Sequence, residues 1–286
     1  MRRWCPVMVV AAMACLLLSV PTFAQEKTAW DYIAVFAQGE RGPEMEAQFA
    51  AIHGLVELGD AAVGPLLSVV KHQNKNVRSN VITALGRIGT EEGVEPITAA
   101  LADPEADVRG AAAEALGRIG DPNSVQPLLA QLAKEDEMDQ RGALVGLGWL
   151  KAQAAVEPII PKLSSENWEV RWRAALALGQ IGSTLGAAPL TAVAEDENPV
   201  VAAAVAWALG AIAGEPNFAP FTSNLSSEDA GTVWGSAWAL GVIGSPAAVE
   251  VLSQAAGGGG ETAKQACPVV LLWLGAPVME APAAEQ

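Results

Sequence analysis

Few residues of this chain could carry out acid, base or nucleophilic chemistry. Its 286 residues include only two histidines, and His53 and His72 are followed by Gly54 and Gln73 rather than by an acidic residue. No nucleophile is combined with a base and an orienting acid. The glycine run 257–260 is not followed by the Lys-Ser/Thr pair of a phosphate-binding loop. The residue types therefore favour a binding protein over an enzyme, and they indicate no cofactor and no metal.

Tryptophan is the residue type whose placement could carry a function. The chain has nine tryptophans beside a single tyrosine, Tyr32. An indole ring combines a large apolar surface with one N–H donor, and tryptophan is strongly enriched at binding hot spots. Six tryptophans of the C-terminal half recur at related positions: Trp149, Trp172, Trp207, Trp234, Trp238 and Trp273. What these rings can do depends on the elements that position them.

Those elements follow from an internal repeat of 31 residues. The string Leu-Gly-Arg-Ile-Gly at residues 85–89 recurs at 116–120. Variants of the string begin at Leu147, Leu178, Leu209, Leu240 and Leu271. A proline keeps the same period, at Pro65, Pro96, Pro127, Pro158, Pro189 and Pro220. Two unrelated residue types in phase indicate a repeating structural unit.

Each period has the pattern of two helices. Residues 94–101 carry apolar side chains at helical spacing, Asp103-Pro104 interrupts the chain, and residues 108–119 carry a second apolar face. The periodic proline falls early in the first helix, where its missing N–H costs little. One hairpin cannot bury its apolar faces alone, so successive hairpins must stack. The sequence predicts an all-α protein, an α-solenoid of about eight helical hairpins.

The N-terminal residues predict an exported protein. Met1-Arg2-Arg3 is basic, residues 7–20 are apolar but short for a membrane span, and Thr22-Phe23-Ala24 places small residues where signal peptidase reads. We expect cleavage between Ala24 and Gln25 and a periplasmic or secreted protein. Lipidation at Cys15 is disfavoured, because the residues before it are a poor match to a lipoprotein motif.

The remaining chain divides into three predicted parts. Residues 25–59 form an N-terminal capping hairpin, residues 60–275 form the repeat solenoid, and residues 276–286 form a disordered tail. The glycine run 257–260 and Pro268 are expected to disturb the last hairpin.

Charge and cysteine content limit the partners. The chain has 17 basic and 32 acidic residues. Removing Arg2 and Arg3 with the signal peptide leaves a net charge of −17, which disfavours nucleic acid and anionic membrane surfaces. Cleavage also leaves Cys267 as the one cysteine, so no internal disulfide is expected. No second stretch is apolar enough for membrane insertion after signal cleavage.

Residues 103–120 resemble the HEAT-like repeat first described in phycobilisome lyases, the E-Z type repeat superfamily. Asp103-Pro104 precedes Val108-Arg109 and the Leu-Gly-Arg-Ile-Gly string, and Val77-Arg78 and Val170-Arg171 begin two more copies. The resemblance covers about residues 42–275. It implies that the second helix of each hairpin lines the concave side and the first helix the convex side.

The superfamily includes bilin lyases, a di-iron hydroxylase and plain binding scaffolds. An iron site would need several His-Glu pairs, which two histidines cannot supply. A bilin lyase would work beside a cytoplasmic light-harvesting apparatus, whereas a signal peptide directs this chain elsewhere. Both enzymatic branches are therefore disfavoured.

The register of the second helix places the six tryptophans on one face. Counting from the valine of Val-Arg as position 0, positions 0, 4, 8 and 11 form the core face, and positions 2, 6 and 10 lie about 200° round the helix. In early repeats these positions are polar, as at Arg87, Glu114 and Arg118. In later repeats they carry the tryptophans. The rings could pack between neighbouring helices, or they could line a concave groove that binds a partner.

Arginine has two registers in the repeats. Arg78, Arg109 and Arg171 share position 1, where we expect a ladder of ion pairs with turn acids such as Asp103, Asp107 and Glu169. Two other arginines, Arg141 and Arg173, leave this register and fall close to the tryptophan face, which makes them candidates for contact with a partner.

Together these observations predict a non-catalytic, extracytoplasmic binding scaffold. It would engage a partner protein or extended peptide on a concave, tryptophan-rich face through the six tryptophans, Arg141 and Arg173. One alternative is a lyase-like enzyme or cofactor-handling protein that uses the same groove. Another is a structural spacer whose tryptophans are all buried.

Overall fold

The computed structural model describes residues 27–37 and 43–276, and all regular secondary structure in these ranges is helical. The predicted signal peptide with its cleavage site at Ala24 and Gln25 lies outside the described residues, as does the predicted tail beyond Ala276.

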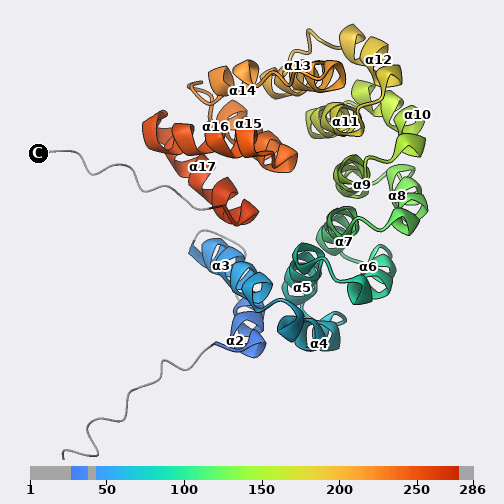
Figure 1. The fold of residues 1–286 in the computed structure, drawn as a ribbon, viewed down its shortest axis with the longest axis vertical. Helices are drawn as coiled ribbons and strands as arrows, with labels where there is room; N and C mark the ends of the chain where they lie inside the picture. The colour runs from blue at the N-terminus through green and yellow to red at the C-terminus, as the bar shows by residue number, and fades with distance from the viewer. Residues whose placement is uncertain (1–26, 38–42, 277–286) are drawn as a thin grey trace, which may run out of the picture.

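The described residues form consecutive helical hairpins, each made of an outer helix and an inner helix (Figure 1). The outer helices are α2 (Ala29–Ile33), α4 (Asp60–Val69), α6 (Val94–Ala100), α8 (Val125–Leu132), α10 (Val156–Ile159), α12 (Ala187–Ala192), α14 (Ala219–Asn224) and α16 (Pro246–Gly258). The inner helices are α3 (Pro43–Leu58), α5 (Lys75–Ile88), α7 (Ala106–Ile119), α9 (Glu137–Trp149), α11 (Trp168–Ile181), α13 (Pro199–Ala213), α15 (Ala230–Ile243) and α17 (Glu261–Leu274). The predicted all-α solenoid of helical hairpins is confirmed.

The repeated residues set where the inner helices begin and end. Asn74 and Asn167 cap α5 and α11, because each side-chain oxygen accepts a hydrogen bond of 2.8 Å from the backbone N–H two residues later. Gly89 ends α5 in the left-handed conformation, with φ of 77°, which glycine adopts without strain. The same turn is made without glycine after α9, where Lys151 has φ of 50°.

The periodic proline sits where the sequence pattern predicts in most hairpins. Pro96 is the third residue of α6, and the corresponding prolines of α8, α10 and α12 are also third residues. Each follows a short 3-10 turn, so the missing N–H falls within the first turn of the α-helix. Pro65 differs, because α4 begins earlier and encloses it.

Two inner helices approach each other closely at glycines. An added methyl group at Gly117 of α7 would overlap the Cα of Gly146 in α9, and one at Gly142 would lie 2.9 Å from the Cα of Gly110. The absence of side chains at these positions lets α7 and α9 pack backbone against backbone. Tight packing of the inner layer beside a wider outer layer curves the solenoid strongly.

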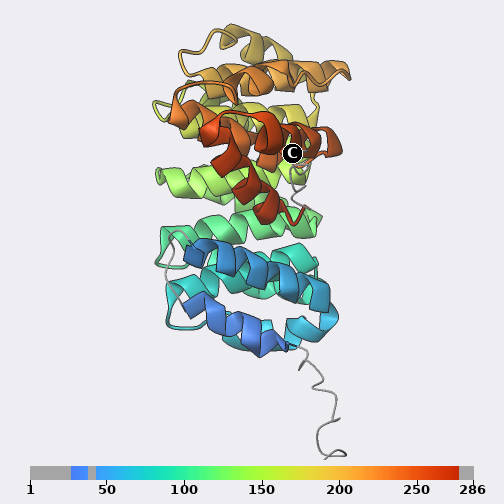
Figure 2. The ribbon, with the colours of Figure 1, turned by 90° about the vertical axis from the view of Figure 1, so that its left-hand side faces the viewer.

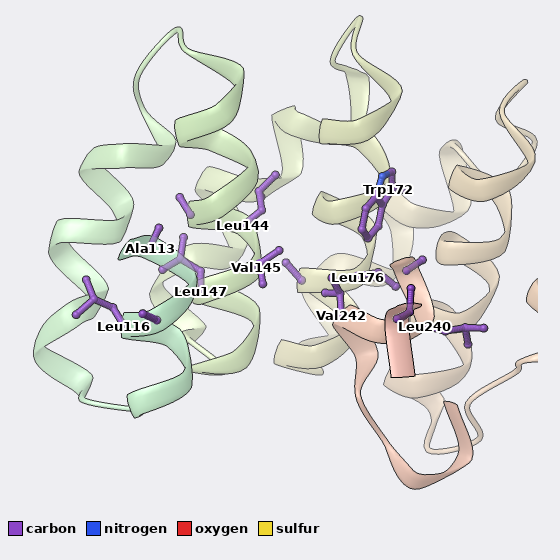
Figure 3. Close-up of a cluster of buried hydrophobic side chains, with 14 of the residues drawn as sticks. Ala113, Leu116, Leu144, Val145, Leu147, Trp172, Leu176, Leu240 and Val242 are labelled. Carbon is purple, nitrogen blue, oxygen red and sulfur yellow. The ribbon is translucent and has the colours of Figure 1, made fainter. Parts of the chain in front are cut away.

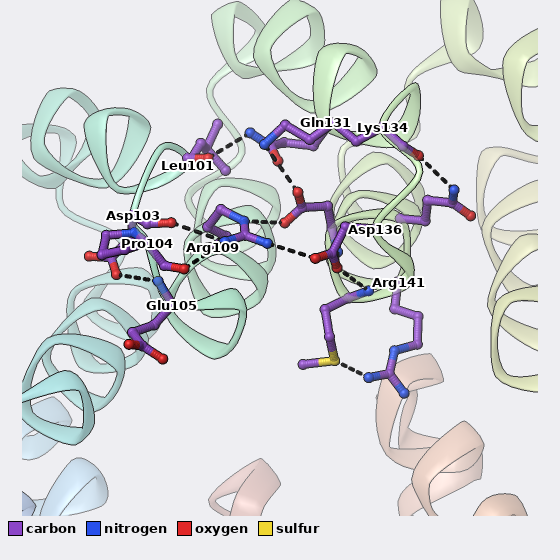
Figure 4. A network of polar contacts seen from close by, with 12 residues as sticks. Leu101, Asp103, Pro104, Glu105, Arg109, Gln131, Lys134, Asp136 and Arg141 are labelled. Atoms are coloured by element: carbon purple, nitrogen blue, oxygen red, sulfur yellow. Dashed lines mark hydrogen bonds and ion pairs between the residues drawn. The ribbon is translucent and has the colours of Figure 1, made fainter.

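The position-1 arginines form the expected ladder along the stack. Arg78 donates two hydrogen bonds of 2.8 Å to Asp103 of the next hairpin, and Arg171 makes the same fork with Asp196, at 2.7 and 3.0 Å. Arg109 bonds Asp139 at 2.6 Å and Asp136 at 2.9 Å (Figure 4). Each fork joins one repeat to the next, as predicted.

Two of the expected partners were wrong. Asp107 pairs with Lys75 at 3.0 Å, and Glu169 pairs with Arg141 and Arg173. The position-1 arginines reach forward to the following hairpin, whereas Asp107 and Glu169 lie on the first turn of their own inner helices and meet side chains of the preceding hairpin or of their own helix.

The superhelix curls until its two ends meet. Figures 1 and 2 show α17 lying beside α3, and the Arg87 guanidinium of α5 donates a hydrogen bond to the Trp273 carbonyl of α17. The C-terminal hairpins therefore fold against the concave side of the N-terminal and central repeats.

The prediction that the last hairpin would be disturbed was wrong. Helix α16 runs as far as Gly258, and α17 continues through Pro268. Proline removes one hydrogen bond from a helix interior, but Cys267, Val270 and Leu271 are fully buried around it. This burial holds the helix together across the proline, and burial also raises the pKa of the Cys267 thiol to about 12.

Candidate functional site

The C-terminal tryptophans differ in their exposure. Trp172 is only 1% exposed and Trp207 only 6%, so a partner cannot reach either ring in this conformation. The remaining four rings, Trp149, Trp234, Trp238 and Trp273, are half-buried.

Helix α15 packs against the inner face of α9 and α11. Trp149 of α9 and Gln180 of α11 both donate side-chain hydrogen bonds to the Val242 carbonyl, at 2.9 and 3.1 Å. Figure 3 shows Val242 of α15 against Leu176 of α11. Residues 93 positions apart in the sequence are thus in contact across the interior of the superhelix. In its C-terminal half, the concave face is largely occupied by the protein itself.

Three of the half-buried rings, those of Trp149, Trp238 and Trp273, gather near the point of closure. Trp238 and Trp273 pack edge to face with ring centroids 5.4 Å apart. The Arg118 guanidinium of α7 lies 4.4 Å from the Trp149 ring centroid and 5.2 Å from that of Trp273. Arg87 also lies over Trp273, at 5.5 Å. Cation–π attraction at such distances holds each guanidinium against an indole face.

The two candidate contact arginines meet at one carboxylate. Arg141 of α9 and Arg173 of α11 both bond Glu169, and the Arg173 contact measures 3.2 Å. Arg173 also lies over the Trp172 ring at 4.1 Å, and Arg141 donates to the Met138 sulfur. Arg173 thus lies against a tryptophan ring, as the register predicts.

A cavity of about 280 Å³ opens among these groups, and we call it the central cavity. Its lining comes from α5, α7, α9, α11 and α17: Thr83, Asp107, Gly110, Ala111, Glu114, Ala115, Arg118, Met138, Arg141, Gly142, Arg173 and Trp273. A second hollow of about 360 Å³ lies on the other side of Arg118 and includes Arg87 and Gly275. Arg118 is thus the wall shared by the two spaces.

The electrostatics of the central cavity are dominated by burial. Burial lowers the pKa of the Arg173 guanidinium to about 10, with attraction by Glu169 opposing this and repulsion by Arg141 adding to it. Burial, together with the nearby Arg118, lowers the pKa of Arg87 to about 10. These shifts mean that the folded protein solvates its inner cations poorly.

Glu114 lies at the centre of this group. Burial raises the pKa of its carboxyl group, although Arg173, Arg118, Arg87 and Arg141 all act to lower it. Four guanidinium groups therefore act on Glu114, and two of them, those of Arg141 and Arg173, also pair with Glu169.

The sequence pattern contained a signal for these inner arginines. Arg87 and Arg118 occupy position 10 of their helices, and Glu114 occupies position 6, the same face that carries the later tryptophans. The register alone indicates an ordinary polar face at these positions, because it does not show that α17 returns to cover them.

The arrangement is suited to holding an anion. Several guanidinium groups in a confined, partly desolvated space bind carboxylate or phosphate oxygens through charge-assisted hydrogen bonds. Among residues 27–37 and 43–276, no group of three histidine, cysteine, aspartate or glutamate side chains is placed to hold a metal ion. The helices described in these ranges also include none that is long and apolar enough to cross a membrane.

Comparisons with known proteins agree with the architecture. A model of HEAT repeats matches residues 33–117, 63–145, 125–210 and 187–267. No curated protein matches the sequence.

Two solved structures are similar in fold. One is the complex of CpcE and CpcF of phycocyanin lyase from Nostoc sp. PCC7120, with 19% sequence identity, coverage of 89% of this chain and 99% of that chain, and a TM-score of 0.50. The other is the YibA protein of Escherichia coli, with 15% identity, coverage of 94% and 98%, and a TM-score of 0.51. At these identities the similarity shows the fold alone.

Proposed function

This chain belongs to the HEAT-repeat family, and from that premise we propose that it is a non-catalytic, extracytoplasmic scaffold that binds a partner protein or peptide at the inner face of its superhelix. HEAT repeats generally bind proteins. The observation that carries the proposal is the central cavity, where Arg118, Arg141 and Arg173 line a space of about 280 Å³ beside Trp273. Arginine and tryptophan are the residue types most enriched at binding hot spots.

The closed superhelix limits how the partner can bind. Because α15 and α17 cover much of the concave face, a long extended peptide has no continuous groove in the C-terminal half. Trp172 and Trp207 then stabilise the scaffold, while Arg141, Arg173 and Trp273 border the open space. We therefore favour a partner that inserts a short projecting segment into the central cavity.

The extracytoplasmic location rests on the sequence alone. The basic Met1-Arg2-Arg3, the apolar residues 7–20 and the small residues before Gln25 are typical of a cleaved signal peptide. A cofactor-handling protein of the lyase kind remains the second candidate, and its distinguishing feature would be a chromophore that copurifies with the chain.

Affinity capture from the native extracytoplasmic fraction tests the proposal. The mature protein serves as bait beside a variant in which Arg141→Gln and Arg173→Gln remove two of the four inner arginines. We expect a partner that binds the parent bait and is depleted roughly tenfold or more on the variant, because charge-assisted contacts contribute about 1.5–3 kcal/mol each.

The matched control bait carries Lys162→Gln, which removes a positive charge from the outer 3-10 turn 160–164. It should capture the partner as the parent does. Equal capture by all three baits would contradict a role for the inner face, and a coloured purified protein would favour the cofactor-handling alternative.

A further inference from the structure

The four inner arginines are not equally paired. Glu169 satisfies Arg141 and Arg173, and Arg87 donates one hydrogen bond to the Trp273 carbonyl. Within the residues that the structure describes, Arg118 has neither a hydrogen-bond partner nor an ion pair within 4 Å, and the Nε of Arg87 is buried without an acceptor. Arg118, which lines the central cavity, thus has guanidinium donors without acceptors.

Aromatic rings hold Arg118 in place, since in the described part of the chain it forms no ion pair within 4 Å and Glu114 acts on it only as a nearby charge. Its guanidinium carbon lies over the rings of both Trp149 and Trp273, at 4.4 and 5.2 Å from their centroids. Stacking on indole uses the face of the guanidinium plane and leaves the N–H groups at its edge available for hydrogen bonds. Since Arg118 lines the central cavity, these donors are accessible from that space.

The charges of the cavity define which anion it can take. Glu169 already bridges two arginines, which shows that a carboxylate fits the geometry of this cluster. Glu114 and Asp107 also line the cavity and would repel a dianion such as phosphate more strongly than a monoanion. The net charge of −15 of the chain further disfavours approach by a polyanion.

From these contacts we infer that the central cavity is a carboxylate-binding pocket, in which Arg118 forms a fork with one carboxylate and Trp149 and Trp273 flank it. The inference rests on the proposed scaffold function, in which this carboxylate belongs to an acidic side chain of the partner segment. A volume of about 280 Å³ accommodates a side chain and its immediate backbone rather than a folded element.

The test is a titration of the full mature chain with a small probe. NMR monitors the titration through the indole N–H signals of Trp149 and Trp273. The probe is N-acetyl-glutamate α-amide, and its neutral isostere N-acetyl-glutamine α-amide is the matched control at equal ionic strength. We expect the glutamate probe to shift both signals in a saturable manner and the glutamine probe to leave them in place.

Two variants locate the binding. Arg118→Gln should weaken the affinity for the glutamate probe by roughly tenfold or more, because a bidentate charge-assisted contact is lost. Lys162→Gln, which removes the same charge from the outer layer, should leave the affinity unchanged. The comparison of glutamate and glutamine probes needs no substitution, so it remains decisive if Arg118→Gln does not fold.

Further arms separate the sources and the competing outcomes. If butyrate binds with the same affinity as the glutamate probe, the pocket is supported and is assigned to small carboxylic acids. If the glutamate probe binds more tightly than butyrate, the pocket is supported as a peptide site. Equal behaviour of the glutamate and glutamine probes, binding of inorganic phosphate in their place, or unchanged affinity in Arg118→Gln would each overturn the inference. If the parent bait and an Arg118→Gln bait then captured the same partner equally well, the scaffold function would still be supported although the carboxylate pocket would be contradicted.

Discussion

Replacing Trp172 by alanine is expected to lower the free energy of unfolding by about 3–5 kcal/mol. The ring is 1% exposed on α11, and its removal would leave a cavity beside Arg173, whose guanidinium lies 4.1 Å from the ring centroid. Urea-induced unfolding, followed by circular dichroism, measures the change. The expectation decides between the two interpretations of the tryptophan face at this position, since a ring that only lines a groove could be removed with little loss of stability.

Trp30 provides the matched control, because its side chain is 53% exposed. Trp30→Ala should change the free energy of unfolding by no more than about 0.5 kcal/mol. If Trp172→Ala unfolded at the same urea concentration as the parent protein, the assignment of Trp172 to the packed interior would be wrong.

The second large effect is expected at Arg109. Its guanidinium bonds Asp139 at 2.6 Å, and the Asp139 side chain is only 2% exposed. Arg109→Leu would remove that partner. Of the cations in residues 27–37 and 43–276, only Lys134, at 3.0 Å, would still pair with this buried carboxylate. Breaking a buried ion pair costs about 3–5 kcal/mol, so we expect a loss of that order in urea unfolding.

Two comparisons show whether the cost comes from the unpaired charge. Removing both partners in Arg109→Leu with Asp139→Leu should recover much of the lost stability, because no buried charge remains. Lys75→Leu, which breaks a more exposed pair with Asp107, should cost at most about 1 kcal/mol. A single Arg109→Leu variant as stable as the parent would contradict the role of the ladder in joining repeats.

Local structure could be predicted well from the sequence because it depends on neighbouring residues. The 31-residue period, the left-handed Gly89 and the position of Pro96 all follow from the backbone requirements of one hairpin. The forward reach of Arg78 to Asp103 was also predictable, since it depends only on the offset between adjacent repeats. Asp139 was not among the turn acids expected to pair with the position-1 arginines, because it lies within α9 rather than in a turn.

The candidate site could be predicted only in part, because it depends on the curvature summed over many repeats. A small change in the angle between hairpins decides whether α17 stays distant from α3 or meets it. The sequence register placed Trp273, Arg118 and Glu114 on the inner face, but it could not show that they meet. It also could not distinguish the buried Trp172 from the half-buried Trp149, since α15 covers the two positions differently.

Closure of the superhelix is what turns a long concave face into a small pocket. Without α17, Arg118 would face solvent and would need no special ligand. With Trp273 packed against it, the guanidinium loses water on one side and keeps its donors toward the central cavity. The proposed selectivity for a carboxylate on a short projecting segment therefore depends on the contact between the first and last repeats.

That contact can be measured directly by pulsed EPR between two spin labels in a Cys267→Ala background, one at Glu57 on α3 and one at Gln265 on α17. Both positions are exposed, so the labels should not disturb the packing. A closed superhelix predicts a single, narrow and short distance distribution. A broad distribution centred at long distance would show that the ends of the solenoid stay apart and would contradict the account.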